Sequence, residues 1–467
     1  MRFRPRVFGL SADLDAGEML ARLRSRRGLA ALDSAGGHPR RSSLVAFDPL
    51  RGVAAPGALV DLRAMLAGLR AEAGDPVPGP FRGGFLGALS YDLGVAGERA
   101  VGAVPDPWRS PRIAGGLYVD FVVRDEERGA AWLVLGDDPG DGRSPVEARR
   151  REILALLERP APAPASLPRG PLVRHTTAEE HAARIERARE RIAAGDFYQV
   201  NLAHRFTRSM DGDPIDLYRV LREHHPAPYM GYLGFQDGAI LSASPELLLE
   251  FDGVLARTRP IKGTAPRGAD PEEDACRARE LLASPKDGAE LAMIVDLERN
   301  DLGRVCVPGS VRVERHPHLE SYATVHHLSA DVVGTPRAGV DAVGLLAALF
   351  PGGSVTGAPK LAAIEAIAEL EGEGRGFFTG ALGCLDLSGR AAFNILIRTL
   401  VWRPGEVSFH VGGGITWSSD ARAEVDETLT KGAALAAALE GPIRGKKGRS
   451  RSSQGRSPAR RPGPGGW

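Results

Sequence analysis

The sequence predicts a fold of mixed helices and strands, on three observations. Runs rich in β-branched and aromatic residues alternate with segments whose apolar residues recur at helical spacing. This alternation stops at a stretch rich in Pro and Ala and then starts again. The chain has 467 residues, 43% hydrophobic and 25% charged, which is the balance of an ordinary globular protein. Its length is sufficient for roughly two to three domains of average size.

The first part of the chain is expected to form a region of its own, followed by a connector. The sequence ERPAPAPASLPRGP at 158–171 favours a stiff, solvated linker, because alternating Pro and Ala extend the backbone. We therefore predict an N-terminal region at 1–157 and a second domain at 172–440. The elements expected before the linker are strands at 42–47 and 116–123 and helices at 55–73 and 148–157.

A long amphipathic helix is expected to open the second domain. Thr176 and Thr177 precede Glu179 and Glu180 in the pattern of a capping box, and helical apolar spacing continues to Ala194. The later elements expected are strands at 198–205, 230–235, 239–243 and 247–251, and helices at 271–283, 289–298, 338–349, 358–370 and 423–439.

Charge is distributed unevenly between the body of the chain and its last residues. The whole chain has 60 basic and 59 acidic residues, for a formal net charge of +1. Eight basic and no acidic residues lie in 441–467, so the chain up to Glu440 has a net charge of −7. This tail is poor in apolar residues and is expected to be disordered. The tail contains no folded motif that would recognise nucleic acid, so we expect no nucleic-acid partner.

Cysteine usage and the N-terminus favour a cytoplasmic protein. Cys276, Cys306 and Cys384 have no CxxC spacing, which argues against a disulfide framework and against a zinc knuckle. The first 20 residues contain no continuous apolar core of a signal peptide. No segment approaches the ~20 consecutive apolar residues that a membrane helix needs, so no membrane association is expected.

Lysine is rare in this chain, and its positions are therefore informative. Outside the tail it occurs at Lys262, Lys286, Lys360 and Lys431, whereas most other cations are arginine. These positions are candidates for roles that a wide, permanently charged guanidinium cannot fill. Lys262 lies in the loop-like segment TRPIKGTAPRG, where both a solvated lysine and a deprotonated, nucleophilic lysine remain open.

The glycine-rich segment FPGGSVTGAPK at 350–360 precedes a predicted helix. Its glycine spacing fits a phosphate-binding loop, but that motif then requires Lys-Ser/Thr, where this chain has Ala358 and Pro359. Nucleotide binding is therefore excluded. Either the segment is a tight turn, or its backbone amides hold a carboxylate.

Carboxylates recur on two predicted helices. Glu290 shares a helical face with an apolar stripe, so it is either an acid favoured by the helix dipole or an acid facing a site. Glu424 and Glu427 are three residues apart, and Lys431 follows Glu427 by four, which fits a surface ion pair or a pair of inward carboxylates. Carboxylates from two helices are ligands that a hard cation such as Mg²⁺ uses.

Other candidate acids and bases lie in two short segments. Glu246 in SASPELLLEF is flanked by hydrophobic residues, which could raise its pKa into the range of a general acid. His326 and His327 in TVHHLSA lie in a β-like run, and the spacing does not decide which is functional.

The order and context of these segments resemble the chorismate-utilising enzymes, in particular component I of aminodeoxychorismate synthase. A looser resemblance extends through LDS at 32–34 and GGFLGALSYDLG at 83–94, so that it covers about residues 28–440. The matching segments in the second half are GDFYQVNLA (195–203), SPELLL (244–249), PIKGTAPRG (260–268), KDGAELAMIVDLERNDLGRVC (286–306), VHHLSA (325–330), FPGGSVTGAPK (350–360), GALG (380–383), NILIRT (394–399), GGGIT (412–416) and EVDETLTKG (424–432).

The resemblance implies antiparallel sheets packed with helices in two lobes around a cleft that holds the active site. It implies Mg²⁺ as cofactor, bound by Glu290 and Glu427 with Glu424 nearby, and holding the ring carboxylate of chorismate. The implied contacts to substrate carboxylates are Thr264, Arg398, Gly412, Gly413, Gly414 and Lys431.

The resemblance also assigns the chemistry. Glu246 would protonate the departing 4-hydroxyl of chorismate. Gln199 stands where relatives that add water have a lysine base, which points to ammonia as nucleophile here. Lys262 would attack C2 while the hydroxyl leaves, and ammonia would then displace it at C4. Anthranilate synthases usually have alanine in place of Lys262, and in them a histidine matching His327 assists the elimination of pyruvate.

The implied activity is that of aminodeoxychorismate synthase component I, which serves 4-aminobenzoate and folate synthesis. The alternative is component I of anthranilate synthase, in tryptophan synthesis. The implied partner is a glutamine amidotransferase subunit that supplies ammonia, and it would be a separate chain because no cysteine here lies in a glycine-flanked elbow. Relatives carry an aromatic amino-acid pocket in the N-terminal region, for which Ser34 is the candidate residue.

Overall fold

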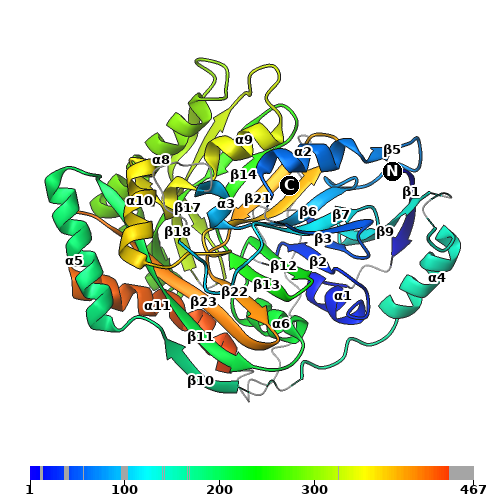
Figure 1. Cartoon of the computed structure of the whole chain (residues 1–467), viewed down its shortest axis with the longest axis horizontal. Helices are drawn as coiled ribbons and strands as arrows, with labels where there is room; N and C mark the ends of the chain where they lie inside the picture. The colour runs from blue at the N-terminus through cyan, green and yellow to red at the C-terminus, as the bar shows by residue number, and fades with distance from the viewer. Residues whose placement is uncertain are drawn as a thin grey trace.

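Two large β-sheets form the framework of the protein (Figure 1). The computed structural model describes residues 1–440 apart from 11–13, 36–41, 56, 96–103, 139, 141, 166, 168 and 324. The tail at 441–467, which is expected to be disordered, lies outside the described residues.

The first sheet has 13 strands among the described residues. Every pairing in it is antiparallel except that of β1 with β5. Its longest pairing joins Val200–Met210 of β11 to Gly405–Ile415 of β23. In spatial order the strands are β10 (Arg169–Arg174), β11 (Gln199–Met210), β23 (Gly405–Ile415), β22 (Thr399–Arg403), β13 (Gly238–Ser244), β12 (Tyr229–Phe235), β2 (Ala30–Asp33), β3 (Ser42–Ala46), β8 (Phe121–Asp125), β9 (Ala130–Asp137), β1 (Arg2–Leu10) and β5 (Arg70–Ala71), with β19 (Gly357–Ala358) on β11.

The second sheet has 10 strands among the described residues, all paired antiparallel. Its order is β16 (Ile261–Pro266), β18 (Val325–Gly334), β15 (Ala256–Arg259), β14 (Leu247–Phe251), β21 (Ala391–Ile395), β20 (Ala381–Asp386), β6 (Gly84–Leu89), β7 (Ile113–Tyr118) and β4 (Arg51–Ala55), with β17 (Arg312–Ser321) on β18.

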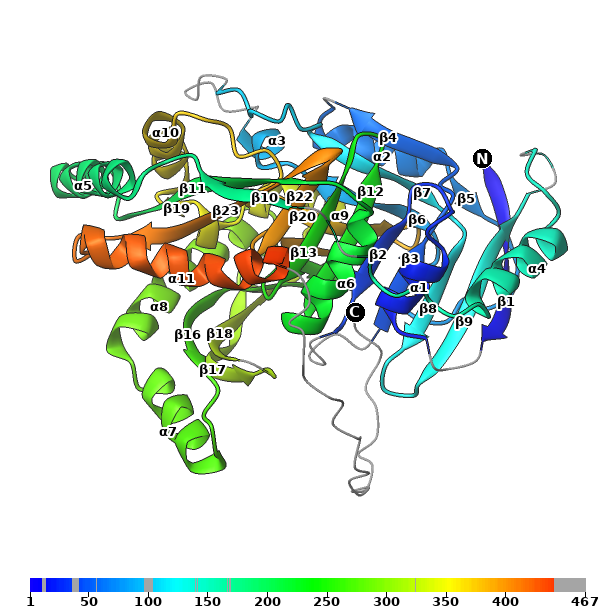
Figure 2. The same cartoon turned by 90° about the horizontal axis from the view of Figure 1, so that it is seen from below.

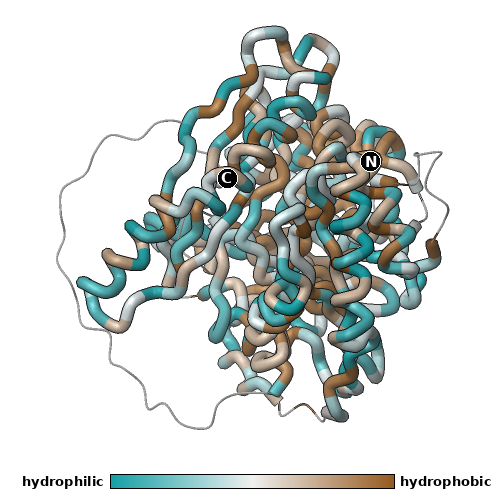
Figure 3. Tube along the Cα trace, turned by 90° about the vertical axis from the view of Figure 1, so that its left-hand side faces the viewer, coloured by the Kyte–Doolittle hydropathy of each residue, from teal (hydrophilic) through white to brown (hydrophobic). Residues whose placement is uncertain are grey.

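Helices cover the outer faces of both sheets, so the molecule has four layers (Figure 1). Hydrophilic residues predominate along the peripheral helices in Figure 3. The predicted antiparallel sheets packed with helices are confirmed. The helices are α1 (Ala16–Arg22), α2 (Leu59–Ala67), α3 (Tyr91–Val95), α4 (Val146–Leu157), α5 (Ala178–Ala194), α6 (Pro214–His224), α7 (Pro271–Leu282), α8 (Pro285–Gly303), α9 (Ala342–Leu349), α10 (Lys360–Glu371) and α11 (Ala421–Glu440), with the short 3₁₀ helix η1 (Gly353–Val355).

Four hydrophobic cores hold these layers together. One lies between the two sheets and includes Leu233 of β12 and Leu382 of β20. A second joins the first sheet to α1, α6 and α11 through residues such as Met19. A third joins the second sheet to α2, α8 and α9 through residues such as Leu291, and a fourth packs α5 and α10 against β11 through residues such as Ile185. Burial of apolar area on this scale is the main stabilising contribution to the fold.

Local signals predicted eight of the helices, whereas α1, α3 and α6 were not expected from the sequence. The capping box of α5 is confirmed, because Thr177 accepts a hydrogen bond from the Glu180 amide while Glu180 accepts one from the Thr177 amide. The helix predicted at 55–73 is shorter, since α2 ends at Ala67 with Gly68 as its C-cap and β5 follows.

The strand predicted at 116–123 is wrong as a single element. The chain leaves the second sheet after β7 and enters the first sheet with β8, and Asp120 lies at the crossing. The buried Asp120 carboxylate accepts hydrogen bonds from Arg143, Arg149 and the Gly136 amide. These long-range partners stabilise the change of sheet at this point.

The segments on either side of 158–171 share both sheets. Strand β2 pairs with β12 and β6 pairs with β20, and each pairing joins a strand before the linker to one after it. In the linker, 162–165 is exposed, whereas Leu167 is 4% exposed and packs into the core beneath α6. In the described part of the chain, no helix combines the length and apolar character needed to cross a membrane.

Two buried histidines lie against each other beneath α5. His181 of α5 and His204 of β11 have ring centroids 4.4 Å apart and are almost fully buried. Burial lowers the pKa of His181 to about 4 and that of His204 to about 3. His204 exchanges a hydrogen bond of 3.0 Å with Thr428, and both ring nitrogens of His181 are without a partner among the described residues.

The protein is therefore expected to lose stability in acid. An unfolded histidine takes up a proton below about pH 6.5, whereas these two remain neutral in the folded state. Their contribution is complete above that pH and falls by about 1.4 kcal/mol per pH unit for each histidine as pH drops towards 4. Urea unfolding at pH 7.5, 6 and 5 measures this slope.

The matched comparison is His181→Leu against His316→Leu, since His316 is exposed. The first change is expected to reduce the acid slope of the unfolding free energy and the second to leave it unchanged. Equal slopes in the two variants would contradict this account.

Candidate active site

The candidate site lies where one end of the second sheet meets α11 (Figure 2). Lys262 on β16 lies within electrostatic range of Glu246, which follows β13, and of Glu290 on α8. On α11, the charge of Glu427 raises the pKa of the same ammonium group and that of Lys431 lowers it. The fold thus brings together predicted site residues that are up to 185 positions apart in the sequence.

Glu246 is a buried acid, and Lys262 is a half-buried amine within range of its charge. Burial raises the pKa of Glu246, although the Ser354 hydroxyl and the charges of Lys262 and Arg398 favour its ionised form. Burial lowers the pKa of Lys262, although the charges of Glu246 and Glu290 oppose this. Glu246 is 4% exposed and its Oε1 has no hydrogen-bond partner among the described residues. Glu246 is therefore suited to donate a proton, and Lys262 to act as an uncharged nucleophile.

Backbone geometry aims Lys262 at the site. The pairing of β16 with β18 shifts register between Lys262 and Thr264, and Gly263 between them has φ +70°. A Cβ at Gly263 would lie 2.9 Å from Asp287 and Leu281 side chains, so a glycine is required by both conformation and space. The Lys262 Nζ donates a hydrogen bond of 3.4 Å to the Ser354 carbonyl.

His327, rather than His326, belongs to the site. Both ring nitrogens of His326 are used by Ser321 and Asp274, so it is a structural residue. His327 Nδ1 exchanges a hydrogen bond of 2.9 Å with Thr264 Oγ1, and its Nε2 is buried without a partner among the described residues. Burial and the charge of Arg398 lower the pKa of His327 to about 3, so the ring is neutral near pH 7.

Arg398 lines a pocket together with His327. The pocket extends outward between Tyr322 and Ala434 of α11. Arg398 adopts φ +49°, a conformation that costs a non-glycine residue free energy and is found where surrounding structure requires it. Burial lowers the pKa of its guanidinium from the usual value, and the Glu246 charge opposes this. A buried cation beside a neutral imidazole is suited to a carboxylate ligand.

Three consecutive glycines on β23 pair with β11 and pack so closely against their neighbours that a side chain would not fit without a shift. A Cβ at Gly414 would lie 2.2 Å from Gln199 Nε2, and one at Gly412 would lie 2.7 Å from the Leu202 carbonyl. A Cβ at Gly413 would lie 3.2 Å from Glu424 Oε2. Gln199 is 2% exposed and its Oε1 is unpartnered among the described residues. The predicted glycine segment and Gln199 therefore lie together.

The predicted carboxylates lie on two helices, and Glu290 of α8 and Glu427 of α11 both act on the charge of Lys262. Glu290 on α8 makes no hydrogen bond or ion pair with any residue that the structure describes. On α11, Glu424 accepts a hydrogen bond of 2.8 Å from Ser419, and Glu427 forms an ion pair of 2.7 Å with Lys431. Burial opposes ionisation of Glu427, but the Lys431 ammonium outweighs it and lowers the pKa of Glu427.

The carboxylates of α8 and α11 could supply some, but not all, of the ligands of a hard divalent cation. Burial, together with the negative charge of Glu427, raises the pKa of Glu424. Within the described ranges, no group of three or more His, Cys, Asp or Glu is close enough to hold a metal ion. A cation here would thus use carboxylates of α8 and α11 together with ligands from substrate and water, which is how Mg²⁺ is commonly bound.

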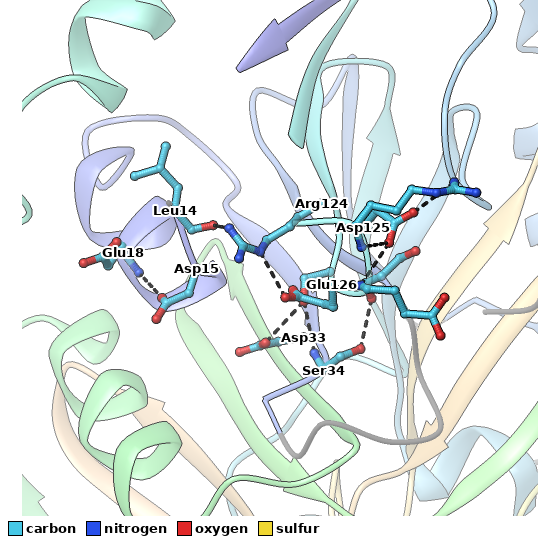
Figure 4. Close-up of polar contacts among 12 residues, drawn as sticks. Leu14, Asp15, Glu18, Asp33, Ser34, Arg124, Asp125 and Glu126 are labelled. Carbon is cyan, nitrogen blue, oxygen red and sulfur yellow. Dashed lines mark hydrogen bonds and ion pairs between the residues drawn. The ribbon is translucent and has the colours of Figure 1, made fainter. Parts of the chain in front are cut away.

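Ser34 lies in a separate polar cluster at the ends of β2 and β3 (Figure 4). Its hydroxyl donates to the Ser42 carbonyl at 3.0 Å, and its amide donates to Ser43 Oγ at 3.2 Å. The neighbouring Asp33 is fully buried and accepts hydrogen bonds from Tyr218 and Arg222. The amino-acid pocket inferred for Ser34 stays a prediction.

Glu298 is a buried acid near the site that the sequence reasoning missed. It lies on α8, is 2% exposed, and has an Oε2 without a partner among the described residues. The burial of Glu298 could have been predicted from the sequence, because it follows Ile294 by four residues and so lies on the same buried face of the helix. The rare lysines also proved informative: Lys262 and Lys431 lie in the site, Lys286 acts on Glu424 and Glu427, and Lys360 pairs with Asp301 beside Glu298.

A buried acid, a half-buried amine beside it and carboxylates from α8 and α11 are features of an enzyme active site. The sequence matches the model of the chorismate binding enzyme family over residues 49–437. The chain therefore belongs to the chorismate-binding enzymes.

Curated relatives and solved structures agree with this family. Over 381 residues the chain is 42% identical to anthranilate synthase component 1 of Streptomyces coelicolor, covering 78% of this chain and 74% of the relative. Over 352 residues it is 40% identical to aminodeoxychorismate synthase component 1 of Klebsiella aerogenes, covering 75% and 76%.

Two solved structures share the fold. Anthranilate synthase component I from Streptococcus pneumoniae superposes with a TM-score of 0.73 at 30% identity, over 84% of this chain and 91% of that chain. The isochorismate synthase MenF of Escherichia coli superposes with a TM-score of 0.74 at 21% identity, over 94% of each chain. The relatives divide between two activities, so membership in the family leaves the reaction open.

Proposed function

We propose that the protein is component I of an aminodeoxychorismate synthase, which converts chorismate and ammonia to 4-amino-4-deoxychorismate. The observation that carries this proposal is Lys262, a half-buried lysine beside the acid Glu246, whose partial burial lowers the pKa of its ammonium. Anthranilate synthases usually have alanine at the matching position, and alanine offers no nucleophile.

The reaction divides into two displacements. Lys262 Nζ forms a bond to C2 of chorismate while the C4 hydroxyl bond breaks, and Glu246 gives its proton to that hydroxyl, which leaves as water. Ammonia then forms a bond to C4, the bond from C2 to Lys262 breaks, and one proton is released as the new amine becomes neutral. The enolpyruvyl group stays on the ring throughout.

The remaining residues bind and orient the substrate. Arg398 and the Thr264 hydroxyl are placed to hold a carboxylate, and the bare amides of Gly412–Gly414 allow close approach of a second. Gln199 leaves the site without a base that would activate water, which favours ammonia as nucleophile. Glu290 and Glu427, with Glu424 nearby, would hold Mg²⁺, which neutralises the ring carboxylate of chorismate when bound.

Ammonia would come from a glutamine amidotransferase subunit encoded separately. Cys276 is exposed on α7, whereas Cys306 and Cys384 are buried in hydrophobic cores, so none of the three lies in the candidate site. The product would serve 4-aminobenzoate and folate synthesis.

Identification of the product tests this proposal. Purified protein is incubated with chorismate, Mg²⁺ and ammonium at alkaline pH, and the products are resolved by mass and fluorescence. A pyruvyl-retaining amine is the expected result. Anthranilate with free pyruvate would instead establish the second candidate, anthranilate synthase, in which the neutral, unpartnered Nε2 of His327 is placed to take part in pyruvate elimination.

Removal of the cation is expected to abolish turnover. With EDTA in excess, Glu290, Glu424 and Glu427 would repel the substrate carboxylate, so chorismate consumption should fall to background and return on addition of Mg²⁺. Isothermal titration of the metal-free protein with Mg²⁺ measures the site directly, and Glu290→Gln is expected to weaken that binding. Full activity in EDTA would contradict the assignment.

A further inference from the structure

Three buried polar atoms without partners gather around η1. They are Glu246 Oε1, Ser354 Oγ and Glu298 Oε2, and none has a hydrogen bond to a described residue. Buried polar groups are nearly always hydrogen-bonded, so a cluster of three exceptions requires an explanation. The Ser354 hydroxyl lies near enough to the Glu246 carboxyl to favour its ionised form, although no hydrogen bond joins them, and the amide of Gly353, the preceding residue, favours the ionised form of Glu298. The two acids thus flank a single turn.

The space around Glu298 is narrow. A Cβ at Gly353 would lie 3.3 Å from Glu298 Oε1 and 2.4 Å from Leu297 Cδ2. This contact explains why a glycine is found at 353 and shows that the carboxyl presses against the turn. On its other side, Lys360 pairs with Asp301 and donates to the Leu349 carbonyl at 3.0 Å.

The charges around Glu298 leave it protonated near neutral pH. Burial raises the pKa of Glu298 to about 8, and the charges of Asp301 and Glu246 add to this, while Lys360 and the Gly353 amide oppose it. Beyond this set, Lys262 on β16 faces Glu246, and Arg304 faces Asp301. Glu298 is therefore a carboxylic acid with a proton to give, one turn away from the acid of the reaction.

We propose that Glu298 is a positioning residue for the acid step, holding the proton that Glu246 regains through the Ser354 hydroxyl. This inference rests on the proposed function of Glu246. After Glu246 gives its proton to the leaving hydroxyl, Ser354 donates its proton to the Glu246 carboxylate and takes the proton of Glu298. The carboxylate left on Glu298 lies beside the Lys360 ammonium. The proton released by the amine at C4 returns to this chain of groups, so each turnover ends with no net change.

Glu298→Gln tests the inference, because the amide keeps the size of the side chain but cannot supply the proton. Chorismate loss is followed against pH at a fixed concentration of unprotonated ammonia. Glu298→Gln is expected to lower kcat about ten-fold with KM for chorismate unchanged, and to remove the part of the alkaline decline in kcat that follows Glu298 near pH 8, while the part that follows Glu246 remains. Asp296→Asn is the matched control, since Asp296 is an exposed acid on the same helix.

Glu298→Met provides a second variant of similar length that removes the carboxyl without adding a polar group. It is expected to fold, as shown by thermal unfolding, and to have the same kinetic defect. A kcat and an alkaline decline equal to wild type in both variants would overturn the inference.

The readout separates this inference from the proposed function. Formation of anthranilate by the wild type would overturn the proposed function, while chorismate loss would still report the acid step. For a protein that consumes no chorismate, infrared spectroscopy decides: a protonated carboxyl band that titrates near pH 8 and is absent in Glu298→Gln supports the inference. Absence of that band from the wild type overturns it.

Discussion

Lys262→Ala is expected to abolish formation of the pyruvyl-retaining amine, with a loss of at least about 10³-fold in kcat. Alanine offers no atom to bond to C2, so the first displacement cannot occur. The loss should be in kcat and not in KM for chorismate, because Arg398, Thr264 and the glycine segment still hold the substrate. Mass-resolved product formation with ammonium measures it.

Lys262→Arg is the decisive companion variant. Arginine keeps the positive charge between Glu246 and Glu290 but does not lose its proton. A nucleophilic role predicts that it is as inactive as alanine, whereas a purely electrostatic role predicts that arginine retains most of the activity. Retained activity in Lys262→Arg would contradict the nucleophile assignment.

Glu246→Gln is expected to lower kcat by about 10² to 10⁴-fold, the range for loss of a positioned general acid. Burial keeps the Glu246 carboxyl protonated at pH values where an exposed glutamate is ionised. The pH profile measures this: wild type should lose activity as Glu246 ionises on the alkaline side, and the residual activity of the variant should not follow that titration.

Stability separates this role from a structural one. Glu246 is buried with an unpartnered oxygen, so its replacement by the neutral amide is expected to leave the unfolding midpoint unchanged or to raise it. Glu250→Gln is the control, because Glu250 lies on neighbouring β14 and pairs with Arg257 at 4.0 Å outside the site. A Glu246→Gln protein with wild-type kcat would contradict the acid assignment.

Helices and caps of this fold could be predicted from sequence because their signals are local. The capping box of Thr177 and Glu180 and the helix at 271–283 depend only on neighbours along the chain, and both are confirmed. Sheet membership depends on distant partners. No neighbour of Asp120 in the sequence indicates that the chain changes sheets there. The arginines that donate hydrogen bonds to its carboxylate lie further along the chain, at positions 143 and 149.

The residues of the candidate site could be predicted from the sequence, but their protonation states could not. Motif order pointed to Lys262, Glu246 and the carboxylates of α8 and α11, and the fold brings them together. The neutral state of His327 and the protonated state of Glu298 follow from burial by segments far away in sequence. Burial of that kind cannot be inferred from spacing alone.

The sharing of both sheets has a consequence for how the chain can be cut. Six residue pairs join β6 to β20, and four join β2 to β12, whereas the exposed linker stretch at 162–165 carries no strand pairing. Cleavage by a protease in that stretch would leave two fragments that remain paired by strands in both sheets. Expressed separately, each fragment would carry open sheet edges, so the halves should fold by complementing one another and regain the site only as a pair.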